Sequence, residues 1–131
     1  MNEKDLINEA FEAQKKSIAK YSGFRVGAAL ETADGKIYRG ANIENASYSL
    51  TVCAERTAMF SALLAGERKF KRIAIVSDSQ NITAPCGACR QVLNEFCDED
   101  FEVLMANKDG DFVVKTLGEL LPYGFKGEDL E

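Results

Sequence analysis

The sequence contains no histidine and no tryptophan, and only two prolines among its 131 residues. Without histidine, Ser-His-Asp and Cys-His catalysis, a histidine general base and any zinc site that needs an imidazole are excluded. A metal would have to be held by thiolates, carboxylates or backbone oxygens. Basic side chains are outnumbered, 16 against 21 acidic ones, and the net charge is -5. This balance argues against a nucleic-acid partner, because affinity for phosphate backbones comes from clustered lysine and arginine.

Long apolar runs and targeting signals are missing as well. No stretch approaches the roughly 20 apolar residues of a membrane span, so we expect no membrane partner. The sequence opens on the polar residues MNEKD, with no apolar run behind a basic cluster, and this argues against a secretory signal. We therefore expect a cytoplasmic protein, where thiols stay reduced. Its four cysteines then favour metal binding or catalysis over two disulfides.

Length and apolar patterning predict a single α/β domain over residues 1–131, because roughly 100–150 residues is the commonest domain size. The spacing of apolar residues predicts helices over 3–19, 53–65, 86–96 and 117–121. Strands are expected over 26–30, 36–43, 69–77, 101–106 and 112–115. We expect a layered domain with a five-stranded mixed β-sheet flanked by helices. Its active site should lie where the second and third helices begin, beyond the strand ends.

Two turns connect neighbouring strands in this prediction. Asp34-Gly35 indicates a two-residue hairpin of type I′, in which both central residues need positive φ. The turn over residues 108–111 should join the last two strands in antiparallel pairing. Thr116 follows as a candidate cap of the brief last helix.

Two short cysteine motifs, each opening a predicted helix, carry the chemistry. They are CAE at residues 53–55 and PCGAC at residues 85–89. Cys86 and Cys89 are three apart and share a helix face, and helix N-termini favour thiolates. Together with Cys53 they could hold three corners of a zinc tetrahedron. An open fourth corner distinguishes a catalytic zinc site from a closed structural one.

The open corner would hold water, whose pKa zinc lowers from about 15.7 toward about 7. Glu55 would act on this water as general base. Cys53 must then lie at or before the helix start, because residues two apart within a helix point to nearly opposite sides. A ligand-x-Glu motif combined with Pro-Cys-x-x-Cys is the pattern of the zinc nucleobase deaminases, whose ligands are His/Cys/Cys or three cysteines.

Four segments resemble the cytidine deaminases of the small, homotetrameric kind. They are YSGFRVGAA at 21–29, GANIEN at 40–45, CAERTA at 53–58 and PCGACRQ at 85–91. The resemblance implies one zinc ion per subunit and a nucleoside substrate. The implied reaction, in pyrimidine salvage, is hydrolytic deamination of cytidine and 2′-deoxycytidine with release of ammonia. Zinc-bound hydroxide would attack C4 of the base, and Glu55 would shuttle the protons.

The resemblance also implies substrate contacts within one chain. Asn42 and Glu44, two apart on a strand, would point the same way and bind the ribose hydroxyls; a solvated strand end is the alternative. Phe24 would pack near the pyrimidine, or else simply in the core. The backbone N–H of Ala54 and the carbonyl of Cys86 would orient the base.

Two aromatic residues are implied to act between subunits. Phe125 lies in a polar tail, where a large aromatic has little intrachain role, and would reach a neighbouring subunit's active site in a homotetramer. Tyr48 is implied to have a similar role between subunits.

Arg56 is implied to hydrogen-bond the zinc-ligand sulfurs and offset the negative charge of three thiolates. The alternative for Arg56 is a surface ion pair.

Three alternatives remain open at this point. The substrate could be a modified cytosine nucleoside, such as a nucleoside antibiotic. The chain could be a non-enzymatic zinc module in which Cys97 closes a four-cysteine site, although Cys97 has no motif around it and suits a small buried apolar residue. It could also be a thiol-disulfide enzyme that uses Cys86 and Cys89, which would leave Glu55 without a role.

Overall fold

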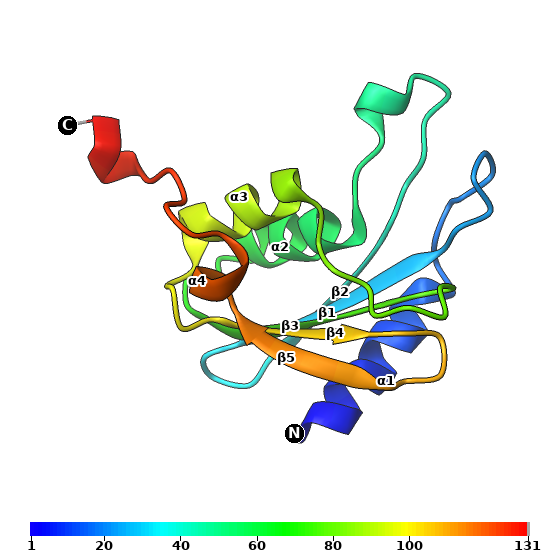
Figure 1. Cartoon of the computed structure of the whole chain (residues 1–131), viewed down its shortest axis with the longest axis horizontal. Helices are drawn as coiled ribbons and strands as arrows, with labels where there is room; N and C mark the ends of the chain where they lie inside the picture. Colours follow the sequence, from blue (N-terminus) through cyan, green and yellow to red (C-terminus); the bar gives the residue numbers. More distant parts are fainter. Residues whose placement is uncertain (131) are drawn as a thin grey trace.

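A five-stranded mixed sheet forms the centre of the computed structural model, which describes residues 1–130 (Figure 1). The strand order is β2-β1-β3-β4-β5. In chain order, the strands are β1 (Val26–Thr32), β2 (Ile37–Ala41), β3 (Phe70–Ser77), β4 (Glu102–Ala106) and β5 (Phe112–Thr116). Among the five strands of residues 1–130, only β3 and β4 pair in parallel. The pairs β1·β2, β1·β3 and β4·β5 are antiparallel. The predicted five-stranded mixed sheet is confirmed.

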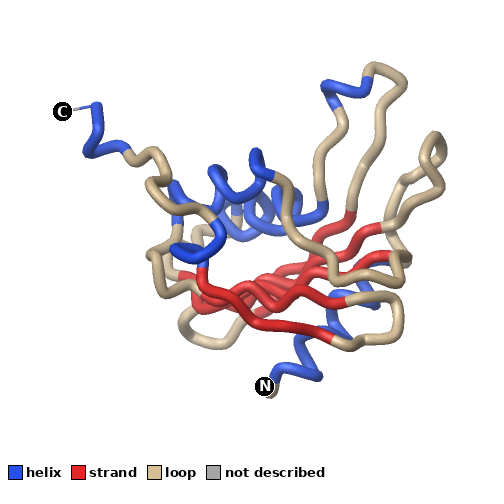
Figure 2. Tube along the Cα trace, in the orientation of Figure 1, coloured by secondary structure: helices blue, strands red, loops and turns tan. Residues whose placement is uncertain are grey.

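Helices cover both faces of the sheet (Figure 2). The helices are α1 (Glu3–Gln14), α2 (Ala54–Leu64), α3 (Gly87–Phe96) and α4 (Leu117–Leu120), with 3₁₀ turns at Tyr48–Leu50 and Gly127–Leu130. Helix α1 lies on one face, and α2 and α3 lie on the other. As predicted, Thr116 caps α4, with a reciprocal capping box to Glu119. Within residues 1–130, no helix has the length and apolar character needed to cross a membrane.

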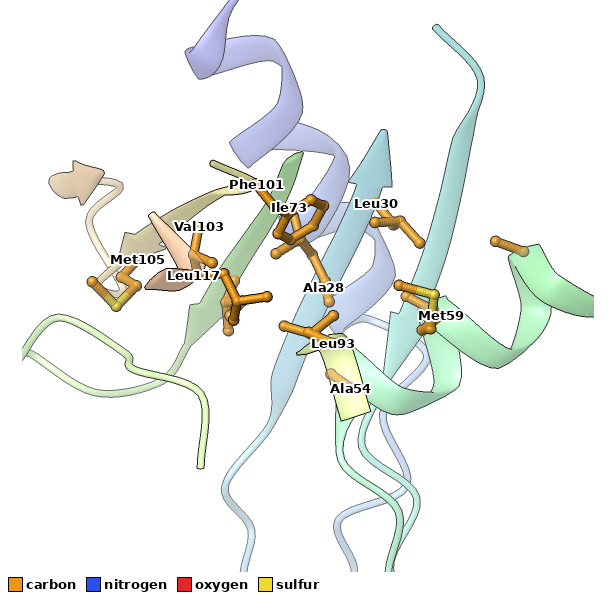
Figure 3. Packing of buried hydrophobic residues seen from close by; sticks show 13 residues of the cluster. Ala28, Leu30, Ala54, Met59, Ile73, Leu93, Phe101, Val103, Met105 and Leu117 are labelled. Carbon is orange, nitrogen blue, oxygen red and sulfur yellow. The ribbon is translucent and has the colours of Figure 1, made fainter. Parts of the chain in front are cut away.

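The core is divided between the two faces because neighbouring strand residues point in opposite directions. On β1, Ala28 and Leu30 pack toward α2 and α3, where Met59 and Leu93 meet them (Figure 3). Ala29 belongs to the second cluster, which packs against α1. The connection from β3 through α3 to β4 is the helical crossover that a parallel pair needs. It brings the start of α3 to the same sheet edge as the start of α2.

The first helix is shorter than predicted, ending at Gln14 rather than residue 19. Beyond it, the Ile18 N–H donates to Asn42 O at 2.9 Å, and the Ile18 carbonyl accepts from Glu44 N–H at 2.8 Å. Because Ile18 pairs with this segment, the chain leaves the helix before residue 18. The second strand ends at Ala41 rather than at Ile43, which forms isolated bridges with Ile18 and Val52.

The first hairpin forms where it was predicted, but its turn is not type I′. Gly35 has φ of 89°, whereas Asp34 is not among the residues with positive φ. Gly35 N–H donates to Thr32 O at 3.0 Å, and Thr32 N–H donates to Lys36 O at 2.9 Å. The loop therefore has three residues and needs a left-handed conformation only at the glycine.

Candidate active site

Three thiols from two helix N-termini converge at one edge of the sheet. Cys53 and Cys86 are the N-caps of α2 and α3, and Cys89 lies in the first turn of α3. Their Sγ atoms all lie within 4.8 Å of one another. Cys53 Sγ is 3.9 Å from Cys86 Sγ, which is 3.4 Å from Cys89 Sγ. All three are free cysteines. Tetrahedral Zn–S bonds of 2.3 Å place sulfurs about 3.8 Å apart, so this donor set fits zinc.

The N-cap geometry explains how Cys53 and Glu55 share one site. Cys53 has extended backbone, with φ -71° and ψ 156°, and α2 begins only at Ala54. Because Cys53 lies before the helix, the divergence of helical residues two apart does not separate its side chain from that of Glu55. Cys86 is extended in the same way, and its Sγ accepts a hydrogen bond from the Cys89 backbone N–H at 3.4 Å. This N–H of the first helical turn holds the Cys86 sulfur at the start of α3.

Arg56 supplies positive charge to this cluster. Its Nη2 donates to Cys53 Sγ at 3.4 Å. The neighbouring Cys89 thiol, and after it Arg56, lower the pKa of Cys53 to about 5. The neighbouring Cys53, followed by burial, raises the pKa of Cys89. The Nε of Arg56 is buried and has no hydrogen-bond partner within residues 1–130. The arginine side chain is therefore directed at the sulfurs rather than at a surface carboxylate.

Glu55 is the buried carboxyl group of the site, with 4% of its surface exposed. Burial is the main cause that raises its pKa to about 7, and the nearby Cys53 thiolate adds to the effect. A carboxyl group with a pKa near 7 can both accept and donate a proton at neutral pH. The thiol cluster and Glu55 therefore combine a metal-ligand set with an acid–base group.

A cavity of about 210 Å³ opens beside these groups. It is lined by the start of β1 and the loop before it, the residue after β2, the segments around the start of α2 and the loop before α3. The lining residues are Phe24, Val26, Asn42, Thr51, Cys53, Ala54, Glu55, Thr83, Ala84 and Cys86. Four of these were not predicted: Val26, Thr51, Thr83 and Ala84. Thr83 and Ala84 directly precede the PCGAC motif, and this adjacency is the signal that could have identified them.

A second cavity of about 380 Å³ adjoins the first, since both are lined by Thr51. It contains two of the predicted residues, Glu44 and Tyr48. The Glu44 carboxylate accepts hydrogen bonds from the backbone N–H groups of Tyr21 and Ser22, both at 3.0 Å, and from the Ser22 hydroxyl. The Ser22 hydroxyl is the first cause of the lowered pKa of Glu44. Glu44 is therefore an ionised group at the rim, next to the thiol-containing cavity.

Asn42 is 7% exposed and cross-links the wall of the smaller cavity. Its Nδ2 donates to Phe24 O at 2.9 Å, and its Oδ1 accepts from Val26 N–H at 2.9 Å and from the Ser17 hydroxyl. Phe24, 41% exposed, stands at the mouth. Asn42 and Glu44 thus face adjoining cavities rather than one common surface.

Phe125 and Tyr48 lie away from the thiols of their own chain. The Phe125 carbonyl accepts hydrogen bonds from Gln91 Nε2 at 2.6 Å and Asn94 Nδ2 at 2.9 Å, which fix it to α3. Its side chain is 54% exposed. Tyr48, 74% exposed, makes an edge-on contact with Tyr21 at 6.3 Å between ring centroids.

Two further features, a fourth cysteine and a larger hollow, lie outside the site. Cys97 is not a member of the thiol cluster, and burial raises its pKa to about 12. A larger hollow of about 500 Å³ lies where β3 and β4 begin, lined by Phe70, Glu102 and charged neighbours. It contains no thiol, and ligands of α/β sheets bind at the opposite, carboxyl ends of the strands.

Comparison with known proteins identifies the family. The sequence matches the family described as "Cytidine and deoxycytidylate deaminase zinc-binding region" over residues 1–105. It is 50% identical over 130 residues to a cytidine deaminase of Halalkalibacterium halodurans, covering 99% of this chain and 98% of that protein. It is 48% identical over 130 residues to one of Sporosarcina psychrophila, covering 99% and 96%.

A solved structure supports the same assignment. The crystal structure of cytidine deaminase from Burkholderia pseudomallei superimposes with a TM-score of 0.93 at 51% sequence identity, covering 95% of this chain and 100% of that one. The predicted fold is therefore confirmed at the level of the whole architecture. With its three-cysteine zinc-binding cluster, the chain belongs to the cytidine and deoxycytidylate deaminase zinc-binding family.

Proposed function

We propose that this chain catalyses the hydrolytic deamination of cytidine and 2′-deoxycytidine to the uridine forms, releasing ammonia. One observation carries the proposal: three thiols from two helix N-termini converge beside a buried glutamate in a cavity. The curated relatives at 48–50% identity are named cytidine deaminases, which supports the same substrate class. Neither a closed four-cysteine site nor a redox pair gives the buried Glu55 a role.

Cys53, Cys86 and Cys89 are the residues that hold zinc in this proposal, one ion per subunit. When bound, zinc supplies Lewis-acid activation of a water molecule, whose pKa falls toward about 7. Glu55 takes a proton from the attacking water and delivers it to N3 of the base. After attack at C4, Glu55 takes the proton of the new C4 hydroxyl and delivers it to the departing amine, so that ammonia leaves and the C4 carbonyl forms. One carboxyl group serves both transfers because they occur in sequence.

The remaining residues bind and orient the nucleoside. Phe24 packs against the pyrimidine at the cavity mouth, and the Ala54 N–H orients the base. Asn42 and Glu44 bind the ribose hydroxyls from the two adjoining cavities. Asn42 has one amide hydrogen beyond the one it donates to Phe24 O. Glu44 keeps acceptor capacity because a carboxylate has about four lone-pair positions.

We also propose a homotetramer of single-domain subunits, residues 1–131, whose active sites are shared. Its support is the exposure of Phe125 and Tyr48, together with two loop arms that project beyond the sheet (Figure 1). A reducing compartment such as the cytoplasm suits the protein, because three free thiols must stay reduced to bind metal.

The variant Glu55→Gln tests the proposed function. It should retain zinc and lose cytidine turnover by about three orders of magnitude or more, because the acid–base group is gone and the ligands remain. Zinc is measured by metal analysis and turnover by ultraviolet absorbance, with a panel that includes 2′-deoxycytidine and modified cytosine nucleosides. Wild-type turnover in the variant would refute the role of Glu55. Turnover of only a modified nucleoside by the unmodified protein would change the assigned substrate.

A further inference from the structure

The segment that carries Phe24 is held by Ser22 within it and by three side chains from other parts of the chain. Five successive backbone polar groups, from the Phe24 N–H to the Val26 N–H, each have a side-chain partner. Asn42 binds the Phe24 carbonyl and the Val26 N–H. The two groups between them, the N–H and the carbonyl of Arg25, use other partners.

Those partners are Asp78 and Gln14. The Arg25 N–H donates to Asp78 Oδ2 at 2.9 Å, and the Arg25 guanidinium donates to the same carboxylate at 3.2 Å and 3.0 Å. Gln14 Nε2 donates to the Arg25 carbonyl at 3.0 Å and to Asp78 Oδ1 at 3.3 Å. We call Asp78 and Gln14, which together hold the Arg25 backbone, the Arg25 clamp.

The clamp is anchored on rigid elements. Asp78 directly follows β3, and Gln14 is the last residue of α1 and is 7% exposed. A Cβ added at Gly27 would lie 2.1 Å from Ala10 O and 2.7 Å from Gln14 N, so α1 lies directly on β1 there. The position of Gln14 relative to the start of β1 is therefore fixed.

We propose that Asp78 and Gln14 are positioning residues that hold the Phe24 ring at the cavity mouth through the backbone of Arg25. The inference rests on the proposed function, since it assumes that Phe24 contacts the base. Neither residue lines the cavity, so both act on the substrate only through the backbone. Asn42 also holds this segment, but it lines the cavity itself, so a change at Asn42 could not separate positioning from contact.

The variant Asp78→Ala tests this with two controls. Arg25→Ala removes the guanidinium pair but keeps the backbone hydrogen bond to Asp78. Glu9→Ala removes the carboxylate of the Arg39–Glu9 ion pair. This pair resembles the Arg25–Asp78 ion pair in its N–O distance, 2.9 Å against 3.0 Å, and in the exposure of its side chains. We expect Asp78→Ala to raise the KM for cytidine about 10-fold with kcat within about twofold, because misplaced binding groups cost affinity. Both controls should stay within about twofold of the unmodified protein.

A double-mutant cycle with Phe24→Ala identifies the route of the effect. If Asp78 acts through the aromatic ring, Asp78→Ala should raise KM less than about twofold in the Phe24→Ala background. A full 10-fold rise there, or an equal rise in Glu9→Ala, would overturn the proposal. Should Asp78→Ala fail to fold, Gln14→Ala replaces it in the same cycle, with the same expected result.

Hydrogen exchange separates failure of this inference from failure of the proposed function. Amides of residues 24–26 should exchange at least about tenfold faster in Asp78→Ala than in Glu9→Ala, without any substrate present. Unchanged exchange would overturn the clamp even in an active enzyme. If the unmodified protein does not deaminate cytidine while exchange responds as expected, the proposed function fails and the assignment of Asp78 to the reaction falls with it.

Discussion

At the scale of single residues, the zinc site carries an excess of negative charge. Three thiolates on a divalent zinc ion leave one net negative charge, and Glu55 adds another when ionised. Such a centre is a weaker Lewis acid than one with neutral ligands. Arg56 donates from its Nη2 to Cys53 Sγ at 3.4 Å, and we propose that this hydrogen bond draws electron density from a ligand sulfur and offsets the charge. On this proposal, the absence of histidine makes the arginine more important than it would be in a site with an imidazole ligand.

Replacing Arg56 by glutamine should therefore weaken catalysis more than metal binding. We expect kcat/KM for cytidine to fall about 10–100-fold, the usual cost of losing a group that supports metal ligands. Zinc content should stay close to that of the unmodified protein at saturating metal. Steady-state kinetics with metal analysis on the same sample provide the measurement. Unchanged kcat/KM in Arg56→Gln would show that the contact with Cys53 has no catalytic consequence.

At the scale of elements, the start of α2 is set by its close contact with β2. A Cβ at Gly40 would lie 2.4 Å from both Ala54 O and Ala58 N, so only glycine fits between the strand and the helix. Ala54 is the first residue of α2, directly after the ligand Cys53. The position of one zinc ligand thus depends on a residue of a neighbouring strand.

The variant Gly40→Ala should destabilise the fold by about 2 kcal/mol or more and reduce zinc affinity, because the helix must move off the strand. Gly127→Ala is the control, since a Cβ there meets no atom of residues 1–130 within 4 Å. Urea unfolding of both variants measures the free-energy change. Equal stability of the two variants would contradict the close contact between α2 and β2.

Sequence patterns predicted which elements exist better than where they end. The amphipathic spacing continued to residue 19, yet α1 stops at Gln14 because Ile18 pairs with the segment around Ile43. The Asp34-Gly35 dipeptide predicted the hairpin correctly and its turn type wrongly, because only Gly35 adopts positive φ. The first error arises from a partner outside the local window, whereas the turn type follows from the three-residue loop that Thr32 and Lys36 close.

The same limit applies to the site. The motifs predicted the three-thiol cluster, because its ligands occupy two helix starts whose positions local patterns indicate. The Arg25 clamp was not predictable, since Asp78 lies 53 residues from its partner and no spacing rule connects them. Thr51 and Thr83 reach the cavity through the packing of loops, which short motifs do not specify.

At the scale of the whole molecule, the proposed tetramer makes a prediction about shared sites. The variants Phe125→Ala and Glu55→Gln should each lose activity as pure proteins. Unfolding and refolding them together forms mixed assemblies, in which an intact Glu55 can meet an intact Phe125 from another subunit. Activity of the mixture should exceed the sum of the separate variants.

Light scattering of the unmodified protein gives the mass of its assembly and hence the number of subunits. A tetramer with complementation supports shared sites. A monomer, or a mixture whose activity equals the sum of its parts, would contradict the role proposed for Phe125 between subunits.

Three thiolates and one glutamate form an open, catalytic zinc site in the proposed function. Zinc content per chain, measured on the same sample as cytidine turnover, is the decisive measurement, with Cys97→Ala and Cys86→Ser as paired variants. An open three-thiolate site gives one zinc per chain with turnover in the unmodified protein and in Cys97→Ala, and loss of both in Cys86→Ser. Loss of zinc from Cys97→Ala, or turnover by a protein free of zinc, would rule this site out.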